Sequence, residues 1–372
     1  MNSLGIAKDP ASTRVVVAMS GGVDSATAAA LLKEQGYDVV GITLQLYNQP
    51  QVSRGKTCCA GQDIYDARRA ADALRIPHYV LDYTDRFKDS VMDDFAATYV
   101  RGETPIPCVR CNQTVKFRDL LGTARKLGAD ALATGHYARR VDGAGGPELR
   151  RAVDASRDQS YFLFATTRDQ LAFLRFPLGG MEKAETRRHA ARLWIAIAEK
   201  PDSQDICFVP DGSYARVVEK LRPGACDPGE IVDLAGRVLG RHDGIIRFTV
   251  GQRRGLGVAS SEPLYVVRLE PESRRVVVGP YANLLDRHVH VRGVNWLVDA
   301  APDEGGIRAQ VKLRSTQEPA AATVFGRGLD GAEVLLDEPV AGIAPGQACV
   351  IYDGDRVLGG GWITRPLAAQ AA

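Results

Sequence analysis

Cysteine, methionine and tryptophan are scarce in this chain, whose 372 residues include 7 Cys, 4 Met and 3 Trp. A low and odd number of cysteines argues against the disulfide framework of a secreted domain and favours a reducing compartment. No apolar run approaches the roughly 18 residues of a membrane-spanning helix. Residues 1–13 also lack the apolar segment of a secretory signal. We therefore expect a cytoplasmic protein that does not cross a membrane.

Charge of one sign is not in surplus either. Lys and Arg number 47 and Asp and Glu number 45, so the net charge at pH 7 is +2. A polycation is excluded, and any nucleic-acid site must come from local basic patches. The 45% of hydrophobic and 25% of charged residues exclude a collagen, a coiled coil and a disordered chain. A chain of this length predicts two or three domains.

The N-terminal half alternates between strand-like and helix-like segments. Strands are predicted at residues 15–19, 38–46, 78–83 and 131–134, and helices at 26–35, 64–75 and 117–127. This alternation is typical of the α/β class, in which a parallel sheet has helices on both faces.

The pattern changes after about residue 210, where Pro223, Gly224, Pro228 and Gly229 mark a connector. Short strands are predicted at 264–269 and 275–278. Further short segments, with turn signals at 353–354 and 359–361, predict a small antiparallel β-barrel of about six strands; the segments are 288–297, 307–314, 322–325, 332–336 and 348–353. The predicted domains are residues 1–210, 211–280 and 281–372.

The first strand-to-helix turn is Ser20-Gly21-Gly22-Val23-Asp24-Ser25. Two glycines let the backbone approach an anion, and the following helix N-terminus offers free N–H groups and a positive dipole. The loop lacks the Gly-Lys-Ser/Thr ending of a Walker A loop and does not fit Gly-x-Gly-x-x-Gly. A glycine pair can simply tighten strand-to-helix packing. The complete pattern in this context favours nucleotide binding.

Cys108 and Cys111 form a Cys-x-x-Cys pair just before the predicted helix, with Arg110, Lys116 and Arg118 nearby. A helix N-terminus and neighbouring cations stabilise thiolates. The sequence therefore places this pair where a thiolate is stabilised.

Cys207 is the obvious third member of a cysteine constellation, and three interpretations stay open at this point. Cysteines fill small apolar gaps, which is how we interpret Cys226 and Cys349. Three cysteines can also hold a metal or an iron–sulfur cluster with one open iron. In the third interpretation one cysteine carries a persulfide and another resolves it by disulfide exchange.

The Ser20–Ser25 loop resembles that of the PP-loop ATP pyrophosphatases, which have an adenine nucleotide alpha hydrolase-like fold. The resemblance to one branch, the tRNA-specific 2-thiouridylases, runs from about residue 14 to 364. Several separate motifs occur here in the order of that family: Cys111-Asn112 ahead of Lys116-Phe117, then residues 133–137, 158–162, 202–208, 251–257 and 345–347.

This resemblance implies a three-part enzyme that uses ATP and Mg²⁺. Its members replace oxygen by sulfur at position 2 of the wobble uridine, U34, in tRNAs for Glu, Gln and Lys, through an adenylated uridine. A persulfide donor or relay protein supplies the sulfur, and nothing requires more than a monomer. The implied nucleotide-binding residues are Ala18, Met19, Ser20, Gly21, Gly22, Val23, Asp24, Ser25, Leu44 and Gly135.

The same resemblance implies that Cys207 receives the persulfide. Cys111 is then the nucleophile that assists sulfur release and ends in a disulfide with Cys207. Residues expected to contact tRNA are Ile106, Pro107, Cys108, His136, Arg157, Asp158, Gln159, Arg314, Ser315 and Gln347, the first three beside the target base.

One departure concerns Cys108, where many family members have Asp. That Asp is a candidate general acid/base, which a cysteine does not simply replace. In related tRNA thiolases three cysteines hold a [4Fe–4S] cluster. We therefore hypothesise that Cys108, Cys111 and Cys207 ligate such a cluster here.

Basic segments at residues 237–254 and 308–327 suit contact with a phosphate backbone, although a solvated charged face has the same composition. We expect the loop at residues 253–257 to become ordered with tRNA. Tyr161 to Phe164 are interpreted as core rather than as a base-stacking platform. Two rival functions remain: a PP-loop enzyme that adenylates a small amide or acid, and a non-enzymatic ATP-sensing or tRNA-binding module.

Overall fold

A computed structural model describes residues 1–47, 60–193, 195, 200, 206–209 and 212–365. The chain forms two compact units. The first contains Met1–Ser90, Cys108–Pro210 and Asp355–Val357, and the second contains Val91–Pro107, Asp211–Gly354 and Leu358–Ala372. Cys58 and Cys59 lie outside the described residues, as do residues 202–205 of one family motif. The predicted domain boundaries at 210 and 280 stay a prediction.

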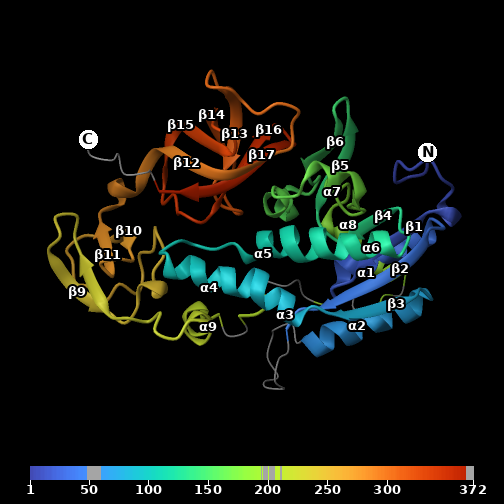
Figure 1. The fold of residues 1–372 in the computed structure, drawn as a ribbon, viewed down its shortest axis with the longest axis horizontal. Helices are drawn as coiled ribbons and strands as arrows, with labels where there is room; N and C mark the ends of the chain where they lie inside the picture. The colour runs from blue at the N-terminus through green and yellow to red at the C-terminus, as the bar shows by residue number, and fades with distance from the viewer. Residues whose placement is uncertain (48–59, 194, 196–199, 201–205, 210–211, 366–372) are drawn as a thin grey trace. The chain divides into compact units, whose positions relative to one another are not determined.

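The first unit is built on a parallel sheet, which confirms the predicted α/β class (Figure 1). Its strand order is β3-β2-β1-β4-β7. The strands are β1 (Arg14–Ala18), β2 (Asp38–Gln45), β3 (His78–Asp82), β4 (Ala131–Thr134) and β7 (Leu174–Arg175). The middle strands are continuous apolar runs because both of their faces are buried.

Helices α1 (Val23–Glu34), α2 (Ala60–Leu74) and α8 (Lys183–Arg192) cover one face of this sheet. Val15 and Val17 of β1 face them across alanine-rich helix surfaces, which permit close packing. Val16 points the other way and is also fully buried, so the sheet is covered on both faces. Tyr161, Leu163 and Phe164 are each 1% exposed, which confirms that these three residues belong to the core, whereas Phe162 is half-buried.

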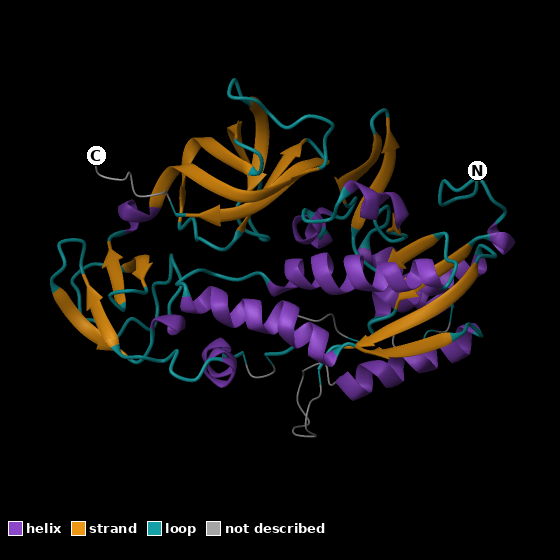
Figure 2. Ribbon diagram, viewed as in Figure 1, coloured by secondary structure: helices purple, strands orange, loops and turns teal. Residues whose placement is uncertain are grey.

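One long helix carries the Cys-x-x-Cys pair (Figure 2). It consists of α5 (Pro107–Arg110), the π-helix η3 (Cys111–Leu120) and α6 (Leu121–Lys126). The predicted start near residue 117 is therefore wrong. Proline is favoured at the first helical position, so Pro107 begins the helix rather than preceding it.

The remaining elements of the first unit surround the sheet. They are η1 (Pro10–Ser12), α3 (Thr84–Phe87), β5 (Ala138–Gly143), β6 (Gly146–Arg151), η4 (Ala155–Arg157), η5 (Ser160–Leu163) and α7 (Arg168–Phe173). The π-helix η2 (Lys88–Met92) continues into α4 (Asp93–Val100) of the second unit.

The second unit contains a small sheet with strand order β10-β11-β8-β9. Its strands are β8 (Gly229–Val232), β9 (Val238–His242), β10 (Tyr265–Glu270) and β11 (Arg275–Gly279). Helix α9 (Tyr214–Leu221) packs on α4 through Tyr214, whose ring centroid lies 6.3 Å from that of Phe95. The short helices η6 (Ile245–Arg247) and η7 (Tyr281–Leu284) lie on either side of β10 and β11 in the chain.

The other part of the second unit is a closed antiparallel barrel, as predicted. In the described chain its strands are β12 (Leu285–Trp296), β13 (Ile307–Lys312), β14 (Ala320–Arg327), β15 (Gly331–Ala341), β16 (Ala348–Asp353) and β17 (Arg356–Thr364). Pairing of β12 with both β15 and β17 closes the barrel. No helix in the described part of the chain is long and apolar enough to span a membrane.

The turn predicted at residues 359–361 is wrong, because these residues lie inside strand β17. A Cβ on Gly359 would lie 2.5 Å from the Asn295 carbonyl oxygen, and one on Gly361 would lie 2.7 Å from that of Arg292. These glycines therefore let β17 pass close to β12. The glycine run reflects a close approach of two strands, which a pattern of turn residues does not reveal.

We expect Gly359→Ala to lower the free energy of unfolding by about 1–3 kcal/mol, because the new methyl group meets backbone. Gly122→Ala is the matched control: the site lies in α6 with nothing within 4 Å, so the change should be neutral or stabilising. Urea unfolding measures both. Equal effects of the two substitutions would contradict this account of β17.

Candidate functional site

The loop at Ser20–Ser25 joins β1 to α1 at the carboxyl edge of the sheet. Gly21 has φ +77°, and a Cβ there would lie 2.2 Å from the Asp63 carbonyl oxygen, so only glycine fits. The Ser25 hydroxyl accepts a hydrogen bond from the Ser20 N–H at 3.1 Å and donates one to the Gly22 carbonyl at 3.1 Å. Gly22 caps α1 without a side chain, which leaves the first N–H groups of this helix available to an anion.

The two other residues predicted for the nucleotide lie at the same edge. Leu44 is near the end of β2, and Gly135 follows directly after β4. A Cβ on Gly135 would lie 2.7 Å from the backbone nitrogen of Ser25. The structure therefore brings Gly135 against the loop. Carboxyl ends of parallel strands are the usual place for a ligand in an open α/β sheet.

Asp24 is the charged residue of the loop, and it is held by a network that the sequence does not reveal. Lys183 Nζ lies 2.8 Å from both carboxylate oxygens of Asp24. The Tyr137 hydroxyl donates to Asp24 Oδ1 at 3.0 Å, and it lies 2.9 Å from the Thr186 hydroxyl. Lys183 is 8% exposed. The network fixes the first turn of α1.

A second lysine braces the loop from the side of α2. Lys200 Nζ donates to the Gly21 carbonyl at 3.0 Å and lies 2.7 Å from Asp63 and 2.6 Å from Asp66. Burial alone lowers the pKa of Lys200, but the hydrogen bonds to the two aspartates outweigh it and raise the pKa. The lysine therefore stays charged. Lys183 and Lys200 lie more than 150 residues beyond the loop, and no local sequence signal marks either one.

Cys111 opens the π-helix and is 8% exposed, whereas Cys108 in α5 keeps exposed surface. Burial raises the pKa of the Cys111 thiol, and the charge of Lys116 opposes this only in part. Protein around the Cys108 sulfur raises the pKa of that thiol in the same way, despite its exposed surface. The thiolate stabilisation expected from the sequence therefore does not determine the pKa of either thiol in the protein without ligands. Desolvation outweighs the cation, and Cys111 lies beyond the first helical turn, where the dipole acts.

Cys207 is exposed and lies in a turn. The next residue, Phe208, packs edge-on against Phe87 of α3 with ring centroids 5.7 Å apart. Arg86 of α3 pairs with Asp119 of η3 at 2.8 Å. Helix α3 therefore connects the Cys207 segment to the π-helix that begins at Cys111.

The proposed cluster ligands do not come together as a ligand set. Among the residues that the structure describes, no three His, Cys, Asp or Glu side chains form a group able to hold a metal. Cys111 is buried while Cys207 faces solvent. The described residues do not fit a cluster on Cys108, Cys111 and Cys207, and we assign these cysteines no metal-ligating role.

His136 lies beside the π-helix, with its ring centroid 6.0 Å from that of Phe117. Its Nδ1 lies 2.7 Å from the Thr134 hydroxyl. Burial and the charge of Lys116 lower the pKa of His136 well below its usual value, so the ring is neutral at pH 7.

The predicted RNA contacts at residues 157–159 lie next to His136. Gln159 Oε1 accepts from the backbone N–H of Tyr137 at 2.9 Å, and Arg157 ends η4. The Asp158 carboxylate is 1% exposed and accepts hydrogen bonds from the N–H groups of Ala152 and Ser160. Its side chain therefore shapes the turn, and only its backbone remains for a contact with RNA.

In the second unit, Gln347 Nε2 donates to the Thr104 carbonyl at 3.2 Å. This bond supports the segment of Ile106 and Pro107, predicted to lie beside the target base. Arg314 Nη2 donates to the Gly342 carbonyl, and Ser315 follows it after β13. A Cβ on Gly251 would lie 3.3 Å from Arg314 Nη2. Arg314 therefore adjoins the start of the loop at residues 251–257.

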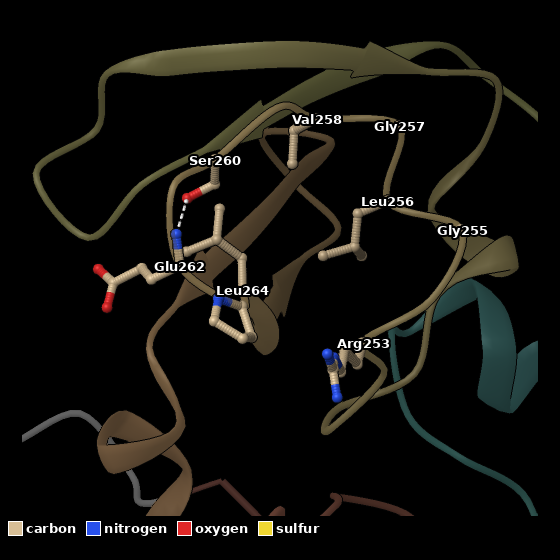
Figure 3. A pocket seen from close by; sticks show the side chains of 9 residues that line it. Arg253, Gly255, Leu256, Gly257, Val258, Ser260, Glu262 and Leu264 are labelled. Atoms are coloured by element: carbon tan, nitrogen blue, oxygen red, sulfur yellow. Dashed lines mark hydrogen bonds between the residues drawn. The ribbon is translucent and has the colours of Figure 1, made fainter.

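A cavity of about 260 Å³ opens on that loop (Figure 3). Arg253 stands at one side and Leu256 points inward, while the Glu262 carboxylate is directed outward, away from Arg253. Gly255 and Gly257 have φ values of +76° and +69°, so the loop needs glycine at both positions. Its ordering by tRNA stays a prediction.

Comparisons with known proteins match this arrangement along the whole chain. Residues 13–211 match a family model described as tRNA methyl transferase HUP domain. Residues 217–280 match a tRNA methyl transferase PRC-barrel domain, and residues 286–363 an Aminomethyltransferase beta-barrel domain.

Full-length relatives carry the name tRNA-specific 2-thiouridylase MnmA. The protein of Rhodospirillum centenum is 65% identical, with 100% of this chain and 96% of that protein covered. The protein of Paramagnetospirillum magneticum is 61% identical, with 98% of each covered. The chain belongs to the tRNA-specific 2-thiouridylase MnmA family. The names of the domain models refer to methyl transfer, but the relatives that align from end to end decide the family.

Membership in the MnmA family, whose members are tRNA-modifying enzymes, confirms the resemblance drawn from the motifs. A solved 4-thiouridine synthetase–RNA complex with bound ATP is 19% identical, with a TM-score of 0.35, and covers 56% of this chain and 49% of that one. This similarity is too low to carry an argument.

For the Asp24 network, we expect Lys183→Met to lower the free energy of unfolding by about 1–3 kcal/mol. The substitution leaves a half-buried carboxylate without its ammonium partner. Because Asp24→Asn removes that carboxylate, the double variant should lose less than the sum of the two single losses. Urea unfolding of the four proteins measures the coupling. Strictly additive losses would show that the ion pair does not hold the loop.

Proposed function

We propose that this chain is a monomeric, cytoplasmic tRNA-uridine 2-sulfurtransferase. It converts U34 of tRNAs for Glu, Gln and Lys to 2-thiouridine, using ATP and sulfur from a persulfide donor. The observation that supports this most is the presence in one compact unit of a glycine loop suited to phosphate and of the Cys111 and Cys207 sulfurs, connected through α3.

In the first step the uridine O2 attacks the α-phosphorus of ATP, and pyrophosphate leaves. The N–H groups of Ser20–Ser25 and the dipole of α1 stabilise the phosphate charge. Mg²⁺, when bound, neutralises further charge on the phosphates. The step is needed because a uridine oxygen is a poor leaving group, whereas AMP leaves readily.

In the second step a persulfide on Cys207 supplies sulfur. The Cys111 thiolate attacks the Cys207 sulfur, a Cys111–Cys207 disulfide forms, and hydrosulfide is released. Hydrosulfide then attacks C2 of the adenylated uridine and displaces AMP. A thiol reductant must restore both cysteines before the next cycle. Because burial raises the pKa of Cys111, this thiol stays protonated until the complex forms.

The direct test is nucleoside mass analysis after incubating the enzyme with unmodified tRNA for Glu, ATP, Mg²⁺ and a persulfide source. We expect 2-thiouridine only with ATP, and at least a thousandfold less with Cys111→Ser or Cys207→Ser, since each removes a reacting sulfur. Cys226→Ser, a change in the second unit, should retain activity.

AMP release without tRNA thiolation by the folded enzyme would favour the rival that adenylates a small molecule. ATP or tRNA binding without AMP release would favour the binding module. Full activity of Cys111→Ser would contradict the assigned sulfur chemistry.

Arg253 and Arg254 are both exposed, and neither guanidinium has an ion pair among the described residues. We expect Arg253→Ala and Arg254→Ala to weaken tRNA binding about two- to tenfold each and to reduce its salt dependence. ATP affinity should not change. Arg237→Ala is the control, because Arg237 is already paired with Asp233 at 2.7 Å. Filter binding at several salt concentrations measures the slope, and an unchanged slope would exclude phosphate contacts by this loop.

A further inference from the structure

Lys116 occupies a distinctive place on the helix that carries the cysteines. It follows Cys111 by five residues within the π-helix Cys111–Leu120. A π-helix bonds residue i to residue i+5, so these two side chains lie one turn apart on the same side of the helix. The neighbouring residue Phe117 packs against His136, which places this side of the helix beside the predicted RNA contacts.

One cation, Lys116, acts on both thiols of the Cys-x-x-Cys pair. Lys116 is the cation that acts on Cys108, on Cys111 and on His136. The other titratable group that acts on Cys111 is Cys108, and among the described residues no carboxylate acts on any of the three. Lys116 therefore faces two thiols and a neutral imidazole.

Arg118 of the same helix, unlike Lys116, is paired with a carboxylate. Arg118 pairs with Asp119 at 2.9 Å, and Asp119 also binds Arg86. Within the described chain, Lys116 has no hydrogen bond or ion pair to an acid, and it is half-buried. A half-buried ammonium without a counter-ion is stabilised when an anion binds beside it.

The anion that best fits this position is sulfur on Cys111. The thiol is nine-tenths buried, and a buried thiolate needs a cation close to it. A phosphate of RNA would also suit an ammonium, but the Cys111 sulfur is a permanent neighbour of Lys116, one helical turn away.

We propose that Lys116 is a positioning residue that pairs with the Cys111 thiolate and makes this cysteine available for sulfur transfer. The Cys111 proton passes to solvent, and no electrons move in this step. The ion pair forms once the Cys111 thiol ionises, which in the free enzyme takes place only at alkaline pH. Its importance for turnover rests on the proposed function of Cys111.

The test is the rate at which iodoacetamide alkylates Cys111, followed by peptide mass analysis from about pH 6.5 to about pH 10 without tRNA. Removing the cation in Lys116→Met should move the midpoint of the profile up by about one pH unit, and below the midpoint the rate should fall about tenfold. Lys116→Arg should restore most of the rate. The matched control Lys126→Met, at the exposed end of α6, should leave the profile unchanged.

The second readout is turnover. In Lys116→Met we expect kcat for thiolation to fall about tenfold, with the release of pyrophosphate in the first turnover and KM for tRNA retained. An unchanged alkylation profile in folded Lys116→Met would overturn the proposal. A raised KM for tRNA with that unchanged profile would assign Lys116 to an RNA phosphate instead.

A second variant and the activity of the wild-type protein separate failure of the ion pair from failure of the proposed function. If Lys116→Met does not fold, Lys116→Gln carries the same test with a polar side chain. If the alkylation profile shifts but the wild-type protein does not thiolate tRNA, the ion pair is correct and the proposed function is wrong.

Discussion

The position of the loop between β1 and α1 depends on two close backbone contacts, one with α2 and one with the residue that follows β4. Gly21 lies against the backbone at Asp63, and Gly135 lies against Ser25, with no room for a Cβ at either glycine. Any other residue would push α2 or the end of β4 away from the loop. Both contacts are steric and independent of charge. They fix the free N–H groups of α1 relative to the strand ends before any ligand is present.

The glycine loop and the cysteine pair differ in their electrostatic surroundings. Near the loop, the cations are already neutralised, since Lys183 pairs with Asp24 and Lys200 with Asp63 and Asp66. Near the cysteines, burial dominates and both thiols are held protonated. A protein arranged in this way keeps its sulfur groups unreactive when substrates are absent. The loop that we propose binds phosphate is also held in place by these two lysines.

Much of this arrangement follows from local sequence patterns, and the failures have physical causes. The parallel sheet, the loop and the barrel are predictable because strand runs, glycines and turn residues act over short distances. The start of the cysteine helix at Pro107 was missed because proline is compatible with both a loop and a first helical turn. Gly359 was misread because a glycine that admits a neighbouring strand looks the same in the sequence as one that turns the chain.

The partners of the loop were not predictable for a different reason. Lys183 reaches Asp24 across 159 residues, and neither residue has a sequence context that names the other. The raised pKa of Cys111 was not predictable either, because the sequence shows nearby cations but not the desolvation that outweighs them. Long-range contacts and burial become visible only in the folded chain.

The central claim is that Cys111 and Cys207 act on one sulfur atom in a single reaction. Peptide mapping after one turnover, with a persulfide-loaded enzyme and no reductant, tests it most directly. The account predicts one Cys111–Cys207 disulfide for each 2-thiouridine formed, with the other cysteines reduced. Formation of 2-thiouridine while both cysteines remain as free thiols would contradict it.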